Sequence, residues 1–399
     1  MPIAPQVEYP SDRSLAGLTR LFDGAWVWEA YCGAFGRSAA NPEQIRVRQF
    51  SHSPGRGALA SYVLDWEEDA YLPPEDFSVK ITGNMAAEVW RFPHDRQLPG
   101  LADAAAPDTA LKLLNRYVHA IPARRVRVEV VRYRPGSRAV LRHSTGKVTF
   151  YVRVMRPALV SRLTAAAEVI GCSEFVVPRL AGHWDDGGVV WLSRIPGTNL
   201  RRYIRRGRPP HPSVLLDGLD SLWSVPIKAD SGRPCNLKGL YRRAKRILRH
   251  ATRGSAEARR SLQSAARILD PFVAAWQPTS LAHNDFYDDQ MLLLPDGRIA
   301  LVDFEETGPG DPMLDVGNLL AHLRIQAGLG QNSQATAAGA YRGRFRLAAL
   351  DRFDWDEREL DLREAVCLFR ICTSTVRNIR PDWACRLTTG LSLTNQLLD

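Results

Sequence analysis

Hydrophobic and polar residues alternate with the period of a β-strand in several short segments between residues 126 and 194. Two of these segments flank the turn Arg134-Pro135-Gly136-Ser137, an arrangement typical of a β-hairpin. Another segment is rich in Ala and Leu and lacks Gly and Pro, which favours a helix. The pattern predicts strands at 126–133, 139–141, 149–155, 176–180 and 189–194, and a helix at 159–170.

Pro196-Gly197 interrupts the chain directly after these strands, and the pattern of the remainder is mainly helical. Ala244 and Leu248, for example, recur at helical spacing among basic residues. A small antiparallel sheet followed by a larger helical part predicts an α+β protein with two lobes. We assign residues 106–196 to the sheet lobe and residues 197–399 to the helical lobe.

A weak internal repeat lies upstream of the sheet lobe. Residues 45–58 match residues 126–139 at a constant offset, and residues 77–81 resemble residues 150–154. The match has two explanations that stay open here: convergence of two ordinary hairpins, or a degenerate copy of the sheet lobe. We predict that residues 1–105 form an N-terminal cap region, which as a partial copy would be scaffold rather than a second active site.

The chain has 399 residues, is 45% hydrophobic and carries a formal net charge of +10. Its length favours two or three structural units. Most of the basic residues are Arg spread along the chain, with local clusters at 201–208 and 242–249, and the second cluster is typical of a solvated helix face. Since no zinc-finger or RNA-binding motif accompanies them, a nucleic-acid partner is not favoured.

The sequence also predicts neither a membrane span nor a targeting leader. No segment approaches eighteen consecutive apolar residues, and Asp12, Asp23 and Glu29 fall within the first thirty positions. The six Cys are scattered without a C-x-x-C pair, which is typical of reduced thiols. We therefore expect a cytoplasmic protein that has no membrane partner.

One segment combines acidic and amide side chains with a second predicted hairpin. Two apolar runs flank the Asp296-Gly297 turn, Asp285 and Gln290 precede the hairpin, and Asp303 follows it. Because an antiparallel hairpin begins and ends at the same edge, these oxygen-bearing side chains are expected to converge. Phosphoryl transfer needs such a group: one carboxylate for the proton of the attacking hydroxyl, and a second carboxylate with an amide oxygen for Mg²⁺.

In this segment the sequence resembles the aminoglycoside phosphotransferase and choline kinase superfamily, whose members are relatives of the protein kinases. His283 and Asp285 match the start of the H-x-D-x-x-x-x-N loop of that family, and Asp303 matches its metal-binding Asp. Asp311 and Asp315 fall in a stretch similar to the G-D-P-x-x-D sequence of the family. The resemblance implies a bilobal, protein-kinase-like fold.

The resemblance covers roughly residues 120–390 and implies ATP as phosphoryl donor, with GTP as the alternative, and Mg²⁺ as the metal. By residue type alone, Asp311 also suits the N-cap of a helix that starts at Pro312. The roles implied for the matched residues are catalytic base for Asp285, metal binding for Gln290 and Asp303, and structural support for His283, Asp311 and Asp315.

Two positions depart from the family pattern. Gln290 stands where the family usually has Asn, and Arg153 stands where the phosphate-binding Lys of the third strand is expected, although Arg and Lys are not interchangeable. Glu168 is the expected ion-pair partner of Arg153, and Ser137 is the expected nucleotide contact where a Gly-rich loop is missing. A catalytically weak pseudokinase that acts as a binding module is therefore the alternative from another functional class.

The acceptor is expected to be a small molecule with a hydroxyl group. The cap-bearing relatives act on sugars, so a sugar or amino sugar is the first choice. A Ser/Thr side chain of a natural-product precursor peptide and an aminoglycoside are the alternatives. The net charge of +10 opposes a polycationic acceptor unless the pocket is locally acidic. The candidate acceptor-binding residues are acidic or aromatic: Asp288, Asp289, Glu305, Glu306 and Trp355.

Overall fold

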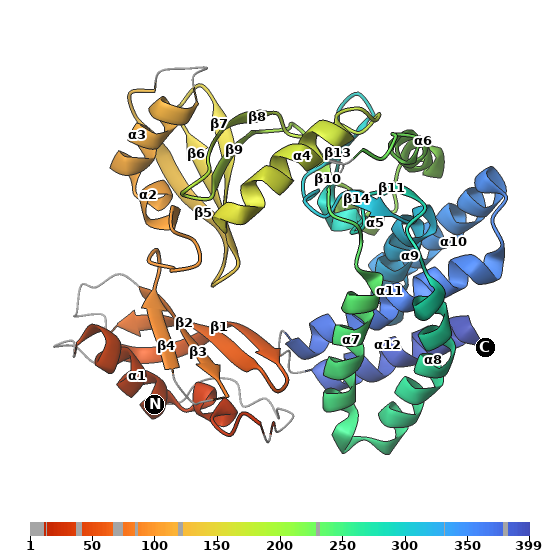
Figure 1. Cartoon of the computed structure of the whole chain (residues 1–399), viewed down its shortest axis with the longest axis horizontal. Coiled ribbons are helices and arrows are strands. Elements are labelled where there is room, and N and C mark those ends of the chain that lie inside the picture. Colours follow the sequence, from red (N-terminus) through yellow and green to blue (C-terminus); the bar gives the residue numbers. More distant parts are fainter. Residues whose placement is uncertain are drawn as a thin grey trace.

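The structure is a computed structural model of the chain. Figure 1 shows three bodies: an N-terminal sheet with a helix in red and orange, a second sheet with helices in orange to yellow-green, and a helical body in green to blue. Residues 1–11 of the predicted cap lie outside the described part. The structure describes residues 12, 14–36, 42–66, 75–83, 87–118, 123–228, 232–330, 332–377 and 382–399.

The middle body is a five-stranded antiparallel sheet with the strand order β5-β6-β7-β9-β8. Its elements are β5 (Arg127–Arg134), β6 (Arg138–Ser144), β7 (Thr149–Met155), α4 (Val160–Ile170), β8 (Leu180–Trp184) and β9 (Val189–Ser193). The predicted hairpin, third strand, helix and last strand are confirmed. The strand predicted at 176–180 is wrong, because Val176 forms a bridge with Ala300 of the helical lobe and the sheet strand begins only at Leu180.

The side chains of β9 alternate between two hydrophobic cores. Val189 and Trp191 pack with the helices α2 (Leu101–Ala105) and α3 (Pro107–Tyr117), whereas Val190 and Leu192 pack with α4. The core on the α4 side continues into the helical lobe, so the two lobes share buried apolar surface.

The boundary of the cap follows from the first of these cores. Leu98 and Leu101 are buried in it together with residues of the five-stranded sheet. The short helix α2 therefore belongs to the sheet lobe, and we place the end of the cap before Leu98 rather than at residue 105.

The N-terminal body is a four-stranded meander in the order β1-β2-β3-β4. Its elements are the 3₁₀ helix η1 (Leu18–Phe22), α1 (Gly24–Phe35), β1 (Pro42–Ser53), β2 (Gly57–Trp66), β3 (Glu75–Thr82) and β4 (Ala87–Arg91). The order β1-β2-β3 repeats the order β5-β6-β7, and both first hairpins turn through a glycine with positive φ, 70° at Gly55 and 68° at Gly136. The register irregularities differ, since one follows Val47 and the other follows Val130. A sheet in this region is confirmed, and its origin as a copy stays a prediction.

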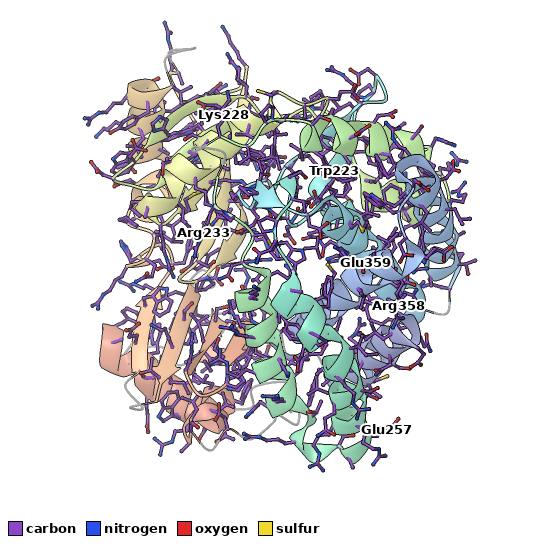
Figure 2. All side chains as sticks on the ribbon, turned by 45° about the vertical axis from the view of Figure 1, so that its right-hand side comes forward. Trp223, Lys228, Arg233, Glu257, Arg358 and Glu359 are labelled. Atoms are coloured by element: carbon purple, nitrogen blue, oxygen red, sulfur yellow. The ribbon has the colours of Figure 1, made fainter. Side chains whose placement is uncertain are left out.

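The third body consists of helices and short strand pairs. Helix α9 begins as expected: Asp311 is its N-cap, Pro312 is its first residue, and the Asp311 carboxylate accepts a hydrogen bond from the Met313 amide at 2.8 Å. Figure 2 draws the side chains on the ribbon and labels Trp223 on α6 and Glu257 at the exposed start of α8. The elements of this helical body are β10 (Thr198–Asn199), α5 (Leu200–Arg205), α6 (Pro212–Trp223), α7 (Leu237–Ala251), α8 (Ala256–Ala275), β11 (Ser280–Ala282), η5 (Asp288–Gln290), β12 (Met291–Leu293), β13 (Ile299–Leu301), β14 (Gly308–Gly310), α9 (Pro312–Gly328), α10 (Ser333–Phe353), α11 (Glu357–Arg377) and α12 (Trp383–Leu398).

The helices of this lobe pack around buried apolar side chains. Two clusters of buried apolar side chains hold these helices, one around α9 and α10 and one around α7, α8, α11 and α12. Within the ranges described above, no helix is both long enough and apolar enough to cross a membrane.

Candidate active site

The loop after β11 is held by one buried carboxylate in the first turn of α9. Asp315 accepts hydrogen bonds from the backbone amides of His283 and Asn284, each at 2.8 Å, and from Trp223 Nε1 at 3.1 Å. Burial raises the pKa of Asp315 to about 7, while these three donors favour its charged form. Asn284 has φ of 65°, a left-handed conformation that Asn tolerates better than most residues. Asp315 therefore fixes the backbone directly before Asp285.

His283 is a neutral, buried part of the same loop. Its Nδ1 accepts a hydrogen bond from the Asp285 amide at 3.3 Å, and its ring packs edge-on against Phe286. Burial lowers the pKa of His283 to about 4, so the imidazole is uncharged at pH 7. This geometry suits the structural role expected for His283. Asp311 lies farther from the loop and accepts hydrogen bonds from Trp276 Nε1 and Arg363 Nε.

Asp285 is positioned by the side chain of Gln290. Gln290 Nε2 donates a hydrogen bond of 2.8 Å to Asp285 Oδ2. Burial raises the pKa of Asp285 to about 6, and the nearby charge of Arg370 works in the opposite direction. The carboxylate is therefore mostly ionised at pH 7, yet its affinity for a proton is higher than that of an exposed Asp. This combination suits a general base.

The predicted hairpin brings the two ends of the acidic segment together. Met291 pairs with Leu301 in the β12–β13 ladder, and the Val302 amide donates to the Gln290 carbonyl at 3.0 Å. Gln290 Oε1 is buried and has no hydrogen-bond partner among the described residues. Gln290 thus pairs through its backbone with the residue directly before Asp303, and its orphaned amide oxygen is of the type that Mg²⁺ prefers as a ligand.

Two arginines hold the carboxylate of Asp303. Arg138 contacts both oxygens, at 3.2 and 3.1 Å, and Arg153 Nη1 contacts Oδ1 at 3.2 Å. Burial alone would raise the pKa of Asp303, but the guanidinium groups of Arg153 and Arg138 outweigh burial and keep that pKa below its ordinary value. The same two guanidinium groups also pair with Glu305.

The prediction that Arg153 forms an ion pair with Glu168 is wrong. Arg153 reaches Asp303 and Glu305 across the lobe junction, whereas Glu168 is exposed on the outer side of α4. Sequence reasoning also missed Arg138. The alternation of side chains along the strands could have identified Arg138. Val140 lies opposite Arg153 in the β6–β7 ladder, and Arg138, two residues before Val140, therefore lies on the same face of the sheet as Arg153.

Two candidate acceptor residues make contacts inside the helical lobe. Asp288 is fully buried and forms a bidentate ion pair with Arg201, at 2.9 and 3.0 Å, so it fastens α5 to η5. Acceptor binding by Asp288 is therefore wrong, because burial and the ion pair already occupy its carboxylate. Trp355 is half-buried, stacks on Phe353 at 4.8 Å and packs against Trp223, and an acceptor contact by this ring stays a prediction.

The other candidate residues lie at the rim of the site. Asp289 is exposed and pairs with Arg201, and Glu306 pairs with Arg162 at 2.5 Å. Ser137 is exposed in the β5–β6 turn, which Asp95 holds through the Gly136 amide at 2.7 Å. A nucleotide or acceptor contact by these residues stays a prediction.

A cavity of about 350 Å³ opens beside Asp285. Tyr287 and His322, whose rings stack at 4.0 Å, form part of its wall. The remaining polar wall is basic, since Arg243 of α7 and Arg370 and Arg377 of α11 line it. A larger cavity of about 1030 Å³ lies between the cap and the β5–β6 turn and does not include Asp285.

One acid, Asp285, shares this cavity with the arginines, and the charge of Arg370 favours its ionised form. In the described part of the chain, neither Arg370 nor Arg377 forms an ion pair, and Arg377 Nε is buried without a hydrogen-bond partner. Burial and the charge of Arg243 lower the pKa of Arg377. The cluster at 242–249 is expected from the sequence to be a solvated helix face, and Arg242 and Arg243 are indeed exposed. Arg243 also lines this cavity, because α7 packs against α11.

Comparisons with known proteins agree with this geometry. The model of the phosphotransferase enzyme family matches residues 123–359, whereas no curated protein matches the sequence. A Ralstonia eutropha protein described as an aminoglycoside phosphotransferase superposes with a TM-score of 0.52 at 14% identity, covering 73% of this chain and 99% of that one. Choline kinase from Cryptosporidium parvum superposes with a TM-score of 0.50 at 11% identity, covering 73% of this chain and 95% of that one.

At such identities the superpositions show the fold alone. The family match extends over more than half of the sequence, and it shows that this chain belongs to the phosphotransferase enzyme family and is a kinase.

Proposed function

We propose that the protein transfers the γ-phosphoryl group of ATP to a hydroxyl group of a small molecule. The observation that carries the proposal is the Asp285 carboxylate, held by Gln290, which faces a cavity and has a pKa near 6. In the reaction the acceptor oxygen bonds to the γ-phosphorus, the bond to the β-phosphate oxygen breaks, and Asp285 takes the hydroxyl proton. GTP is the alternative donor.

Gln290 and Asp303 would hold Mg²⁺, which when bound offsets the negative charge of the phosphates. Arg138 and Arg153 now neutralise Asp303, and we infer that they turn to phosphate oxygens when the carboxylate takes the cation. Arg153 thereby keeps the charge of the family Lys, with a planar fork that suits phosphate.

The charges that line the cavity beside Asp285 support a proposal for the charge of the acceptor. It presents one ionised carboxylate and three guanidinium groups, from Arg243, Arg370 and Arg377. Amino sugars and aminoglycosides would meet repulsion here, so these two earlier choices are not supported. Its volume of about 350 Å³ suits a sugar-sized molecule better than a peptide. We therefore propose a sugar or polyol that carries a phosphate or carboxylate group.

Calorimetry with ATP tests the enzyme against the pseudokinase before any acceptor is known. We expect ATP to bind at least about tenfold more tightly with Mg²⁺ than without it, because the metal offsets the repulsion between Asp303 and the phosphates. Binding that ignores Mg²⁺, combined with no transfer of label from ATP to any sugar, would favour the binding module.

Arg370→Ala tests the charge of the acceptor. Losing one charge-assisted hydrogen bond is expected to raise KM for an anionic sugar by about 10–100-fold, with a small effect on a neutral sugar. Arg242→Ala is the matched control, since Arg242 is an exposed neighbour on α7 that does not line the cavity. Faster turnover of amino sugars than of sugar phosphates or sugar acids by the wild type would contradict this assignment.

A further inference from the structure

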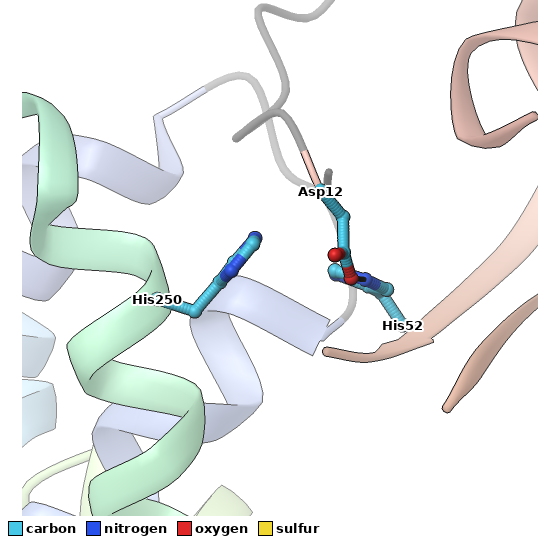
Figure 3. Close-up of side chains that lie close together, drawn as sticks. All are labelled: Asp12, His52 and His250. Atoms are coloured by element: carbon cyan, nitrogen blue, oxygen red, sulfur yellow. Dashed lines mark hydrogen bonds and ion pairs between the residues drawn. The ribbon is translucent and has the colours of Figure 1, made fainter. Parts of the chain in front are cut away.

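Three side chains that commonly bind metals meet between the cap and the helical lobe. Asp12 lies before the first turn of the cap, His52 near the end of β1, and His250 in the last turn of α7. All three residues are buried, with exposed fractions of 7%, 1% and 4%. One ligand atom from each lies within 4.8 Å of the others, and Figure 3 shows the side chains facing a common centre.

Asp12 and His52 also have a structural role. Asp12 Oδ2 contacts His52 Nε2 and accepts from the Gly55 amide, both at 2.9 Å, and its Oδ1 accepts from the Ser14 amide at 3.0 Å. These contacts brace the turn after β1. They do not require a second imidazole from another lobe, because the turn is already held.

His250 nevertheless reaches this centre. Its ring lies 5.4 Å from the ring of His52, at an angle of 70°. Burying two imidazole rings and a carboxylate together costs desolvation free energy that an apolar contact between the lobes would not cost. A bound cation offsets that cost by using the same three groups as ligands.

The donor set suits a transition metal rather than Mg²⁺. Two imidazole nitrogens and one carboxylate oxygen are a frequent combination for Zn²⁺, and imidazole also suits Co²⁺ and its neighbours. Ligands bound to Zn²⁺ at about 2.1 Å lie about 3.4 Å apart in a tetrahedron. The observed spacings, 2.9 Å for the His52–Asp12 pair and up to 4.8 Å overall, reach this geometry by side-chain rotation.

We propose that Asp12, His52 and His250 form a binding site for a divalent transition metal, Zn²⁺ first, that fastens the cap to α7. The consequence concerns the kinase site as well. Helix α7 carries Arg243 and Ile247 of the acceptor cavity, which lie about two turns and one turn before His250. The metal therefore holds one wall of that cavity in place. The assignment itself does not depend on the proposed reaction.

Metal titration of the full chain tests this site. After treatment with a chelator and dialysis, and without nucleotide, the wild type is expected to bind about one equivalent of Zn²⁺ and to gain thermal stability. Co²⁺ should give the absorption bands of a tetrahedral site. His250→Ala should weaken Co²⁺ binding by about 10²-fold or more, because one of three ligands is lost. His183→Ala is the control, since His183 is exposed and pairs with Asp185 outside this cluster.

Two further variants separate this site from the nucleotide metal and from misfolding. Asp303→Asn should keep the Co²⁺ bands, whereas loss of the bands in that variant would place the metal at the kinase site and overturn the proposal. His250→Cys should restore binding and add the intense near-ultraviolet band of a thiolate ligand. Wild-type protein that shows neither Co²⁺ bands nor a Zn²⁺-dependent rise in thermal midpoint would also overturn it.

Discussion

Replacing Asp285 with Asn is expected to lower kcat by about 10³-fold while leaving the affinity for Mg·ATP within a fewfold of the wild type. Asn has the same shape and can keep the contact with Gln290, but it cannot accept the proton of the acceptor hydroxyl. Steady-state kinetics and ATP calorimetry measure the two effects separately. A variant with normal kcat would show that Asp285 is not the base.

The pH dependence provides an internal control for Asp285. Since its pKa in the folded protein is about 6, kcat/KM of the wild type should fall as the pH drops below 6. Its folded pKa lies above the ordinary 3.8, so the stability contributed by its protonated form is complete below pH 3.8 and is lost as the pH rises through 6. Asp285→Asn should therefore melt higher than the wild type at pH 8, and the difference should shrink toward pH 4.

Replacing Asp303 with Ala is expected to lower kcat by about 10³-fold and to remove the dependence of ATP binding on Mg²⁺. The variant loses the charged metal ligand and leaves Arg138 and Arg153 to repel each other, with Glu305 as their remaining carboxylate partner. Calorimetry with and without Mg²⁺ measures whether ATP binding still depends on the metal, and thermal unfolding measures the cost of the repulsion between Arg138 and Arg153.

A matched control for Asp303 lies on the same hairpin. Asp296 is an exposed acid at the β12–β13 turn that pairs with Arg298. Asp296→Ala removes one negative charge from the hairpin without touching the site, so ATP binding should still respond to Mg²⁺. If Asp303→Ala and Asp296→Ala behaved alike, the assigned role of Asp303 would be wrong.

Local residue patterns were sufficient for the elements that carry the chemistry. The Asp296-Gly297 turn places Gln290 and Val302 opposite each other, because a hairpin with this turn leaves little choice of register. The start of α9 followed from Asp311 and Pro312, since capping depends on neighbours in the chain. The strand at 149–155 also matched its pattern.

Elements whose environment lies in another lobe could not be predicted in this way. Val176 lies in an apolar run that reads as a strand, but its partner is Ala300 of the helical lobe. Glu168 lies in the helix that follows the strand of Arg153, which suggested an ion pair between them, but Glu168 is on the exposed face of that helix. Asp288 was expected to bind the acceptor, but it is buried against Arg201, 87 residues away.

The sequence by itself determined the kinase-like order of elements and the identity of the base and metal candidates, because hairpins, caps and short motifs depend on interactions between near neighbours. Only the tertiary structure decided which charges meet. Arg138 and Asp303 are 165 residues apart. Arg243 and Arg370 converge only because α7 packs against α11, and His250 reaches Asp12 only because the cap lies against the helical lobe. Such pairings depend on which faces of distant elements pack against each other, and the spacing of residues along the sequence does not indicate that packing.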